Sequence, residues 1–128
     1  MKWVIEYDET QHYIRITRSG VFSIVHHPKT FEDIISQDFW KPGMPLLFDN
    51  RNIDYNKIDY DEVRQASNNY KEFAEYFGNS KAAMLMKSLS DFGLGRQFEL
   101  MSDGKGGVNM RVFLEETEAL TWLLDKSY

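Results

Sequence analysis

The sequence contains no cysteine, which excludes disulfide bridges, cysteine nucleophiles and thiolate metal sites. Its apolar runs are all far shorter than the roughly 20 residues that a transmembrane helix needs. The first seven residues do not form the continuous apolar stretch of a secretory signal, because Glu6 interrupts them. We therefore expect a soluble, cytoplasmic protein.

Positive charge is also scarce. Fifteen Lys and Arg residues stand against 20 Asp and Glu residues, for a net charge of -5, and the basic residues are scattered singly along the chain. Proteins that bind nucleic acid usually carry a basic stripe or patch, so nucleic acid is not an expected partner. Peripheral contact with a membrane surface remains open.

The chain does have enough apolar material for one core. It is 128 residues long, with 42% hydrophobic and 15% aromatic residues, and it contains no repeat, linker or low-complexity tract. A chain of this size buries about two thirds of its unfolded surface without a metal or a disulfide. We predict a single domain over residues 1–128.

Alternating apolar residues predict an antiparallel hairpin from residues 3–7 and 13–18. Thr30 and Asp33 have capping-box spacing and predict a short helix from Thr30 to about Asp38. The apolar run 45–48 then has the appearance of a strand buried on both faces, central in the sheet.

The second half of the chain alternates helices and strands. Asp59 and Glu62 cap a helix that ends at Gly78, with apolar residues spaced three and four apart. A strand over 82–86, a helix from Ser88 to about Met101, a strand over 110–114 and a helix over 116–124 follow. The order ββαβαβαβα predicts an α/β fold with a mixed, mostly parallel sheet of about five strands and about four helices.

The segments 38–44 and 46–51 resemble the "D-x-F-x-P-G-M…D-x-R" signature of the STAS-like (SpoIIAA-like) family. Residues 92–99 are similar to the third helix of that family, and residues 111–113 and 118–123 to its closing strand and helix. The family includes relatives of anti-sigma-factor antagonists and of SEC14-like lipid carriers. The resemblance implies a SpoIIAA-like fold and a non-enzymatic binding or regulatory role.

In the antagonists, a phosphorylatable Ser or Thr lies between the third strand and the second helix. This sequence has no Ser or Thr between Ser36 and Ser67. We therefore expect that a kinase does not control the loop, which is acidic instead.

Three motifs have a chemical and a structural interpretation. Asp49, Asp54, Asp59 and Asp61 offer oxygen ligands for a hard cation, but their spacing matches no metal-binding loop, so capping and solvated roles are favoured. His26 and His27 could bind zinc or exchange protons, but we expect a surface or loop role. The segment 104–107 is rich in glycine, but it precedes a strand, unlike a phosphate-binding loop, and is interpreted as a connection.

The predicted third helix is the strongest candidate for a ligand site. Gly93 and Gly95 each cost about 1 kcal/mol in a helix, which is tolerated where the backbone must lie close to a ligand or to the sheet. Adaptable apolar residues and one arginine surround these glycines in the sequence. Core packing is the simpler interpretation of this group, and a pocket is the alternative. The candidate ligand-binding residues are Met84, Met86, Phe92, Gly93, Gly95, Arg96 and Phe98.

Two functions follow from the residues and the resemblance. The first is a non-enzymatic domain that binds a small lipophilic molecule or associates with a membrane surface. The alternative is a protein-protein docking module, with Asp49, Arg51, Asp54 and Asp59 as its docking loop and a homodimer left open. We expect no cofactor, no metal and no catalytic residues.

Overall fold

The computed structural model describes residues 1–102 and 109–125. Its element order confirms the predicted ββαβαβαβα sequence. The elements are β1 (Lys2–Asp8), β2 (Tyr13–Val21), α1 (His27–Ile35), β3 (Leu46–Asp54), α2 (Tyr60–Phe77), β4 (Lys81–Leu85), α3 (Leu89–Ser102), β5 (Asn109–Phe113) and α4 (Glu116–Leu123). The glycine-rich segment 104–107 lies outside the described residues.

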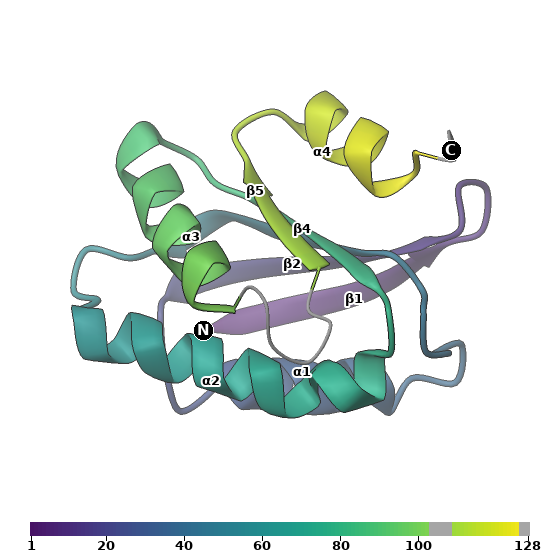
Figure 1. Cartoon of the computed structure of the whole chain (residues 1–128), viewed down its shortest axis with the longest axis horizontal. Helices are drawn as coiled ribbons and strands as arrows, with labels where there is room; N and C mark the ends of the chain where they lie inside the picture. The colour runs from purple at the N-terminus through teal and green to yellow at the C-terminus, as the bar shows by residue number, and fades with distance from the viewer. Residues whose placement is uncertain (103–108, 126–128) are drawn as a thin grey trace.

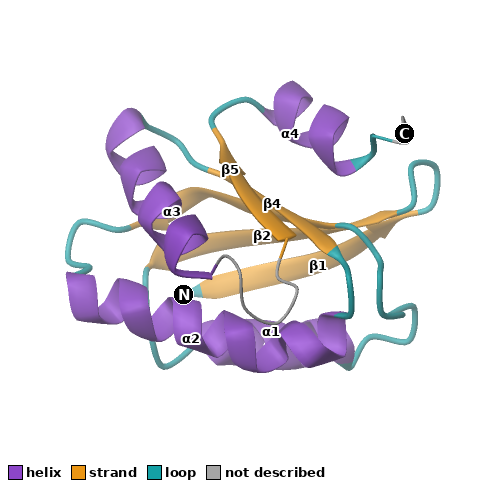
Figure 2. Ribbon diagram, viewed as in Figure 1, coloured by secondary structure: helices purple, strands orange, loops and turns teal. Residues whose placement is uncertain are grey.

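The five strands form one sheet in the order β1-β2-β3-β4-β5. β1 pairs antiparallel with β2, and all the other neighbours are parallel. Successive right-handed crossovers in one direction place the connecting helices on the same face of the sheet. Accordingly α1, α2 and α3 pack together on one face, while α4 packs on the other against β3, β4 and β5 (Figures 1 and 2).

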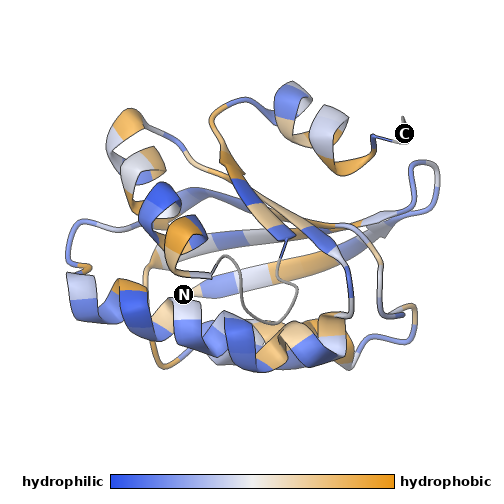
Figure 3. Ribbon diagram, viewed as in Figure 1, coloured by the Kyte–Doolittle hydropathy of each residue, from blue (hydrophilic) through white to orange (hydrophobic). Residues whose placement is uncertain are grey.

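Side-chain alternation along the strands builds two cores of unequal size. On β3, Leu46 and Phe48 point to the larger core under α1–α3, and Leu47 points to the smaller core under α4. β3 is therefore buried on both faces, as predicted for a central strand. Helix α2 is amphipathic, and Figure 3 shows hydrophilic and hydrophobic residues interspersed along it.

The ends of α2 follow from local sequence. The Asp59 carboxylate accepts a hydrogen bond from the Glu62 backbone N–H at 2.8 Å, and the Glu62 carboxylate accepts one from the Asp59 N–H at 3.4 Å. This capping box was predicted from the spacing. Gly78 ends the helix with a φ of 66°, a conformation that favours glycine.

The start of α1 differs from the prediction. The helix begins at His27, three residues before Thr30, and Pro28 occupies its first turn. Proline is well tolerated there because the first N–H groups of a helix have no partner within the helix. Thr30 therefore lies inside the helix and is buried, so it does not cap the N-terminus.

Candidate functional site

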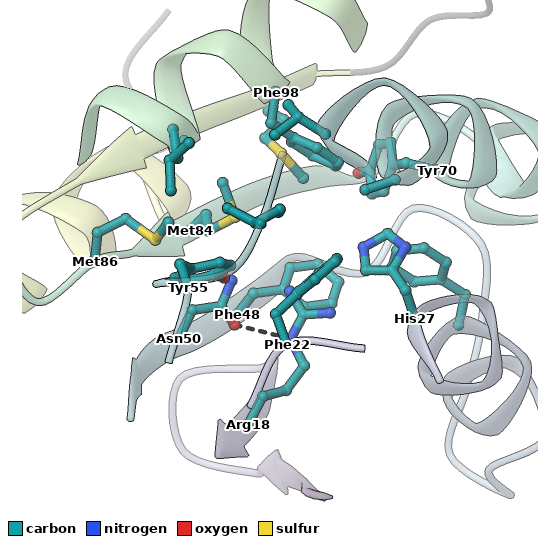
Figure 4. A pocket seen from close by; sticks show the side chains of 17 residues that line it. Arg18, Phe22, His27, Phe48, Asn50, Tyr55, Tyr70, Met84, Met86 and Phe98 are labelled. Carbon is teal, nitrogen blue, oxygen red and sulfur yellow. Dashed lines mark hydrogen bonds between the residues drawn. The ribbon is translucent and has the colours of Figure 1, made fainter. Parts of the chain in front are cut away.

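A cavity of about 40 Å³ lies in the larger core, between the sheet and helices α1–α3. Its walls come from every layer of this side of the molecule: strands β2 to β5, all three helices and the connections that follow β2, β3 and β4 (Figure 4). Aromatic and aliphatic side chains make up most of the lining. Several lining residues lie where parallel strands end, which is where open α/β sheets commonly bind ligands.

The mouth of the cavity is formed by half-buried side chains. Phe22 follows β2, Tyr55 and Ile58 belong to the connection between β3 and α2, and Leu94 lies in α3. Phe22 and Tyr55 stack with ring centroids 5.6 Å apart. The other lining residues are all buried, so these four side chains lie between the cavity and solvent.

Arg18 is the one cationic side chain that lines the cavity (Figure 4). It follows Ile14 and Ile16 along β2, so strand alternation turns it into the core, where only 4% of the residue is exposed. Its Nε donates to the Asn50 Oδ1 at 2.8 Å, and its guanidinium lies 4.9 Å from the centre of the Phe48 ring. Its Nη1 has no partner, and no carboxylate among the described residues forms an ion pair with it.

This arrangement leaves the charge of Arg18 poorly compensated. Removing an ion from water costs several kcal/mol in real proteins. A buried cation-π contact returns about 2 kcal/mol, and one neutral hydrogen bond about 1 kcal/mol. Burial lowers the pKa of Arg18, but a guanidinium keeps its proton in proteins. An uncompensated positive charge therefore lies within an apolar cavity.

Two further polar groups with unpartnered atoms line the same cavity. The Asn50 Nδ2 has no acceptor in good hydrogen-bond geometry, although the Asn50 side chain lies near enough to the Tyr55 phenol to oppose the rise of its pKa. The amide orientation of Asn50 is fixed because Oδ1 accepts from Arg18. The His27 Nδ1 is likewise buried without a partner. Because buried polar atoms in proteins nearly always have partners, these three atoms mark the polar part of an otherwise apolar cavity wall.

The expectation that His27 has a surface or loop role is wrong. His27 is only 3% exposed, and it packs between Phe22, Phe31 and Phe98. Burial, followed by the nearby charge of Arg18, lowers its pKa well below the usual range, so the imidazole is neutral at neutral pH. The start of α1 at His27, instead of Thr30, is what turns this side chain inward.

The two tyrosines of the cavity carry no charge either. Burial, with a smaller contribution from the charge of Asp91, raises the pKa of Tyr55 to about 12, although the charge of Arg18 and the Asn50 side chain oppose the shift. Burial also raises the pKa of Tyr70. With neutral His27 and neutral phenols, the cavity carries the single positive charge of Arg18.

The structure brings together four of the seven ligand-binding residues predicted from sequence. Met84, Met86, Gly95 and Phe98 line the cavity. The other three do not line it. Phe92 is half-buried against the larger core, Gly93 is exposed, and Arg96 is exposed with its Nη1 donating to Glu99 at 2.8 Å.

The two helical glycines have different surroundings. A Cβ on Gly93 would meet no atom within 4 Å, whereas a Cβ on Gly95 would lie 2.6 Å from the Val112 Cγ2 and 3.3 Å from the Met84 Cε. Gly95 therefore allows α3 to approach β5 closely, and in doing so it also forms part of the cavity wall. For Gly95, a role in helix-sheet packing and a role in the cavity wall are therefore compatible.

The four predicted docking-loop residues do not share one surface. Asp49 is buried on the α4 side of the sheet, where Arg15 and Arg51 donate to its carboxylate at 3.2 and 2.8 Å. The same two arginines also donate to Glu116 of α4. Asp54 accepts from the Asn56 N–H, and Asp59 caps α2. All four side chains thus have local partners within the fold.

Sequence reasoning missed Arg18 and Asn50, and it considered His27 but assigned it a surface or loop role. A signal for the first two was present in the strand period, because Arg18 follows Ile14 and Ile16, and Asn50 follows Leu46 and Phe48, on the same faces. A polar residue on the apolar face of a strand is such a signal. His27 had no such signal, since its burial depends on where α1 begins.

Within residues 1–102 and 109–125, no group of three His, Cys, Asp or Glu side chains is placed to hold a metal ion. No helix in the same ranges has the length and apolar character needed to cross a bilayer.

No family model and no curated protein matches the sequence. Among solved structures, an uncharacterised protein of the DUF3478 family from Shewanella loihica PV-4, described as having a SpoIIAA-like fold, superposes with a TM-score of 0.60. The alignment covers 95% of this chain and 92% of that one, at 14% identity. The chain has a SpoIIAA-like fold.

This result confirms the predicted fold class and the predicted resemblance at the level of the fold. Within the SpoIIAA-like fold, α1–α3 and the sheet enclose the cavity, and the connection between β3 and α2 supplies Tyr55 and Ile58 to its mouth. Because one fold hosts unrelated functions, the SpoIIAA-like fold alone does not assign a role to the cavity.

Proposed function

We propose that this chain is a non-enzymatic binding domain that takes a small lipophilic molecule into the cavity between the sheet and helices α1–α3. The observation that carries the proposal is a mostly apolar cavity whose mouth lies where the parallel strands end. Met84 and Met86 are unbranched and adaptable, so the enclosed space can enlarge around a ligand. A cavity of about 40 Å³ is smaller than such a molecule, so binding requires the methionines and the half-buried side chains of the mouth to move outward.

Exposed apolar residues around the mouth support contact with a membrane surface during loading. Val21 and Val25 lie at the end of β2 and in the connection after it, Tyr60 begins α2 and Leu89 begins α3. Each belongs to, or directly flanks, a connection that also forms the cavity. Flotation with phosphatidylcholine vesicles, before and after changing Val25 and Leu89 to Asp, tests whether this surface binds lipid.

The alternative proposal is a protein-protein docking module. It has less support, because Asp49 and Arg51 are engaged with Arg15 and Glu116, and only Asp54 and Asp59 of the predicted loop are exposed.

Native mass spectrometry of the protein purified without detergent, followed by solvent extraction, tests the binding function. We expect a co-purifying small molecule. Ala66→Leu places a larger side chain in the cavity wall and should give a clean mass, while Asn68→Leu, on the exposed side of the same helix, should retain the bound molecule. A clean wild-type mass that stays clean after incubation with lipophilic probes would contradict the proposal and favour the docking module.

A further inference from the structure

The polar groups of the cavity carry information about the ligand beyond its lipophilic character. Arg18 Nη1 and Asn50 Nδ2 are both hydrogen-bond donors without acceptors, and both residues are almost completely buried. They are linked through the hydrogen bond from the Arg18 Nε to the Asn50 Oδ1, so their free donors belong to one connected pair (Figure 4). A ligand group that pairs with these two donors must therefore be a hydrogen-bond acceptor.

The charge of the site selects among acceptors. Arg18 supplies one positive charge, and His27 is neutral because its ring is buried next to that charge. The lining tyrosines are neutral and no lining residue is acidic; Asp91, whose charge acts on Tyr55 from outside, does not line the cavity. One negative charge balances this site, whereas a phosphate monoester, with close to two, leaves an uncompensated charge among aromatic rings.

We propose that the ligand is a monoanionic carboxylate on a small apolar body, with its carboxylate accepting from Arg18 and Asn50. This inference rests on the proposed binding function and names its ligand class. The planar fork of a guanidinium matches the two oxygens of a carboxylate, and bonds of this charged type are among the strongest in proteins. The aromatic walls formed by Phe22, Phe48 and Phe98 receive the apolar body.

Octanoate and 1-octanol are matched probes, since they share a chain length and differ in the charged head group. We expect isothermal titration calorimetry of the full chain at pH 7.5 to show octanoate binding at least tenfold more tightly than 1-octanol. Arg18→Met should weaken octanoate at least tenfold and leave 1-octanol within about twofold, because it removes the charged donor but keeps the apolar wall.

Two further variants locate the effect. Ala66→Leu narrows the cavity and should weaken both probes, and Arg96→Met, which removes an exposed arginine from α3, should change neither affinity. The comparison of the two probes on the wild-type protein needs no variant, so it stays decisive if Arg18→Met does not fold.

The outcomes separate the two proposals. Equal affinity of wild type for octanoate and 1-octanol, or full octanoate binding by folded Arg18→Met, would overturn the carboxylate assignment while leaving a lipophilic binding domain in place. The first of these results would mean that water alone satisfies Arg18. No binding of either probe, together with a clean native mass, would overturn both.

Discussion

At the scale of single residues, Arg18 is costly to the unliganded fold. A guanidinium buried without a carboxylate retains a desolvation penalty that the shorter, uncharged side chain of methionine does not have. We expect Arg18→Met to raise the free energy of unfolding by about 1 kcal/mol or more, as replacing a functional polar group often does. Urea denaturation without ligand measures it.

The control for this measurement is Arg96→Met, which should stay within about 0.5 kcal/mol because Arg96 is exposed. A loss of stability in Arg18→Met would mean that the Phe48 and Asn50 contacts outweigh the desolvation of the charge.

His27 gives stability a dependence on pH. Its pKa in the folded state lies well below that of an unfolded histidine, about 6.5, because of burial and then the charge of Arg18. Below pH 6.5 the unfolded chain therefore binds a proton that the folded protein does not, and stability falls as the pH falls. Between pH 7 and 5.5 we expect His27 to account for about 1 kcal/mol of lost stability.

Denaturation at both pH values tests this expectation. His27→Gln should lose about 1 kcal/mol less than wild type over the interval. Thr30→Val removes another buried, unpartnered polar atom from α1 without removing a titrating group, so it should keep the wild-type slope. Identical slopes for wild type and His27→Gln would contradict a neutral buried imidazole.

At the scale of elements, alanine substitutions at the two glycines of α3 distinguish the effect of helix propensity on stability from the effect of packing. Gly93→Ala should stabilise the protein by about 0.5 to 1 kcal/mol, since its Cβ meets open space. Gly95→Ala gains the same propensity, but its Cβ overlaps the β-branched side chain of Val112, which cannot easily rotate away. We expect a net loss of about 1 to 3 kcal/mol for Gly95→Ala. Thermal unfolding of both variants decides, and equal effects would refute close packing of α3 on β5.

An ion network connects α4 to the sheet. Asp49 of β3 accepts from Arg15 of β2 and Arg51 of β3, and both arginines reach Glu116 of α4. Burial alone would raise the pKa of Asp49, but the hydrogen bonds and charge of Arg51, with the charge of Arg15, lower it overall. The carboxylate therefore stabilises the fold above the unfolded pKa of about 3.9, and this contribution is lost as the pH falls through the folded value.

We expect Asp49→Asn to cost about 1 to 3 kcal/mol at pH 7, because two arginines then share only Glu116. The difference from wild type should shrink as the pH falls below about 4, where the wild-type carboxylate also becomes protonated. Guanidinium chloride screens ion pairs, so urea is the suitable denaturant. A difference that does not change with pH would assign the effect to packing.

At the scale of the whole molecule, the period of the apolar residues was enough to predict the element order, the mixed sheet and the central position of β3. It could not predict the start of α1. The local sequence is compatible with a helix that begins just before Pro28 and with one that begins at Thr30 through the capping-box spacing. The cavity lining could be predicted only in part from the sequence, because it depends on which residues of α1, α2 and α3 meet over β2 and β3. Two of its residues, Gly95 and Phe98, were predicted from α3, and Met84 and Met86 from β4 and the residue after it. Arg18, on the same face of β2 as Ile14 and Ile16, was overlooked.

The cavity and α4 lie on opposite faces of the sheet, which predicts which elements a bound ligand stabilises. The cavity lies entirely on the side of α1–α3, and α4 packs on the opposite face through a separate, smaller cluster that includes Leu47, Leu85 and Leu123. A carboxylate bound at Arg18 adds contacts to the strand ends and connections of the first face and none to α4. The ligand should therefore raise the free energy of local opening near the cavity and leave the free energy of local opening of α4 unchanged.

Hydrogen-deuterium exchange with mass spectrometry measures this difference. Near-saturating octanoate should slow exchange in residues 22–31, 55–66 and 84–98 and leave residues 116–123 unchanged. Arg18→Met with octanoate should exchange as it does without octanoate. Protection spread evenly over both faces would instead mean that octanoate raises global stability without ordering the mouth, and protection of α4 alone would place the ligand on the wrong side of the sheet.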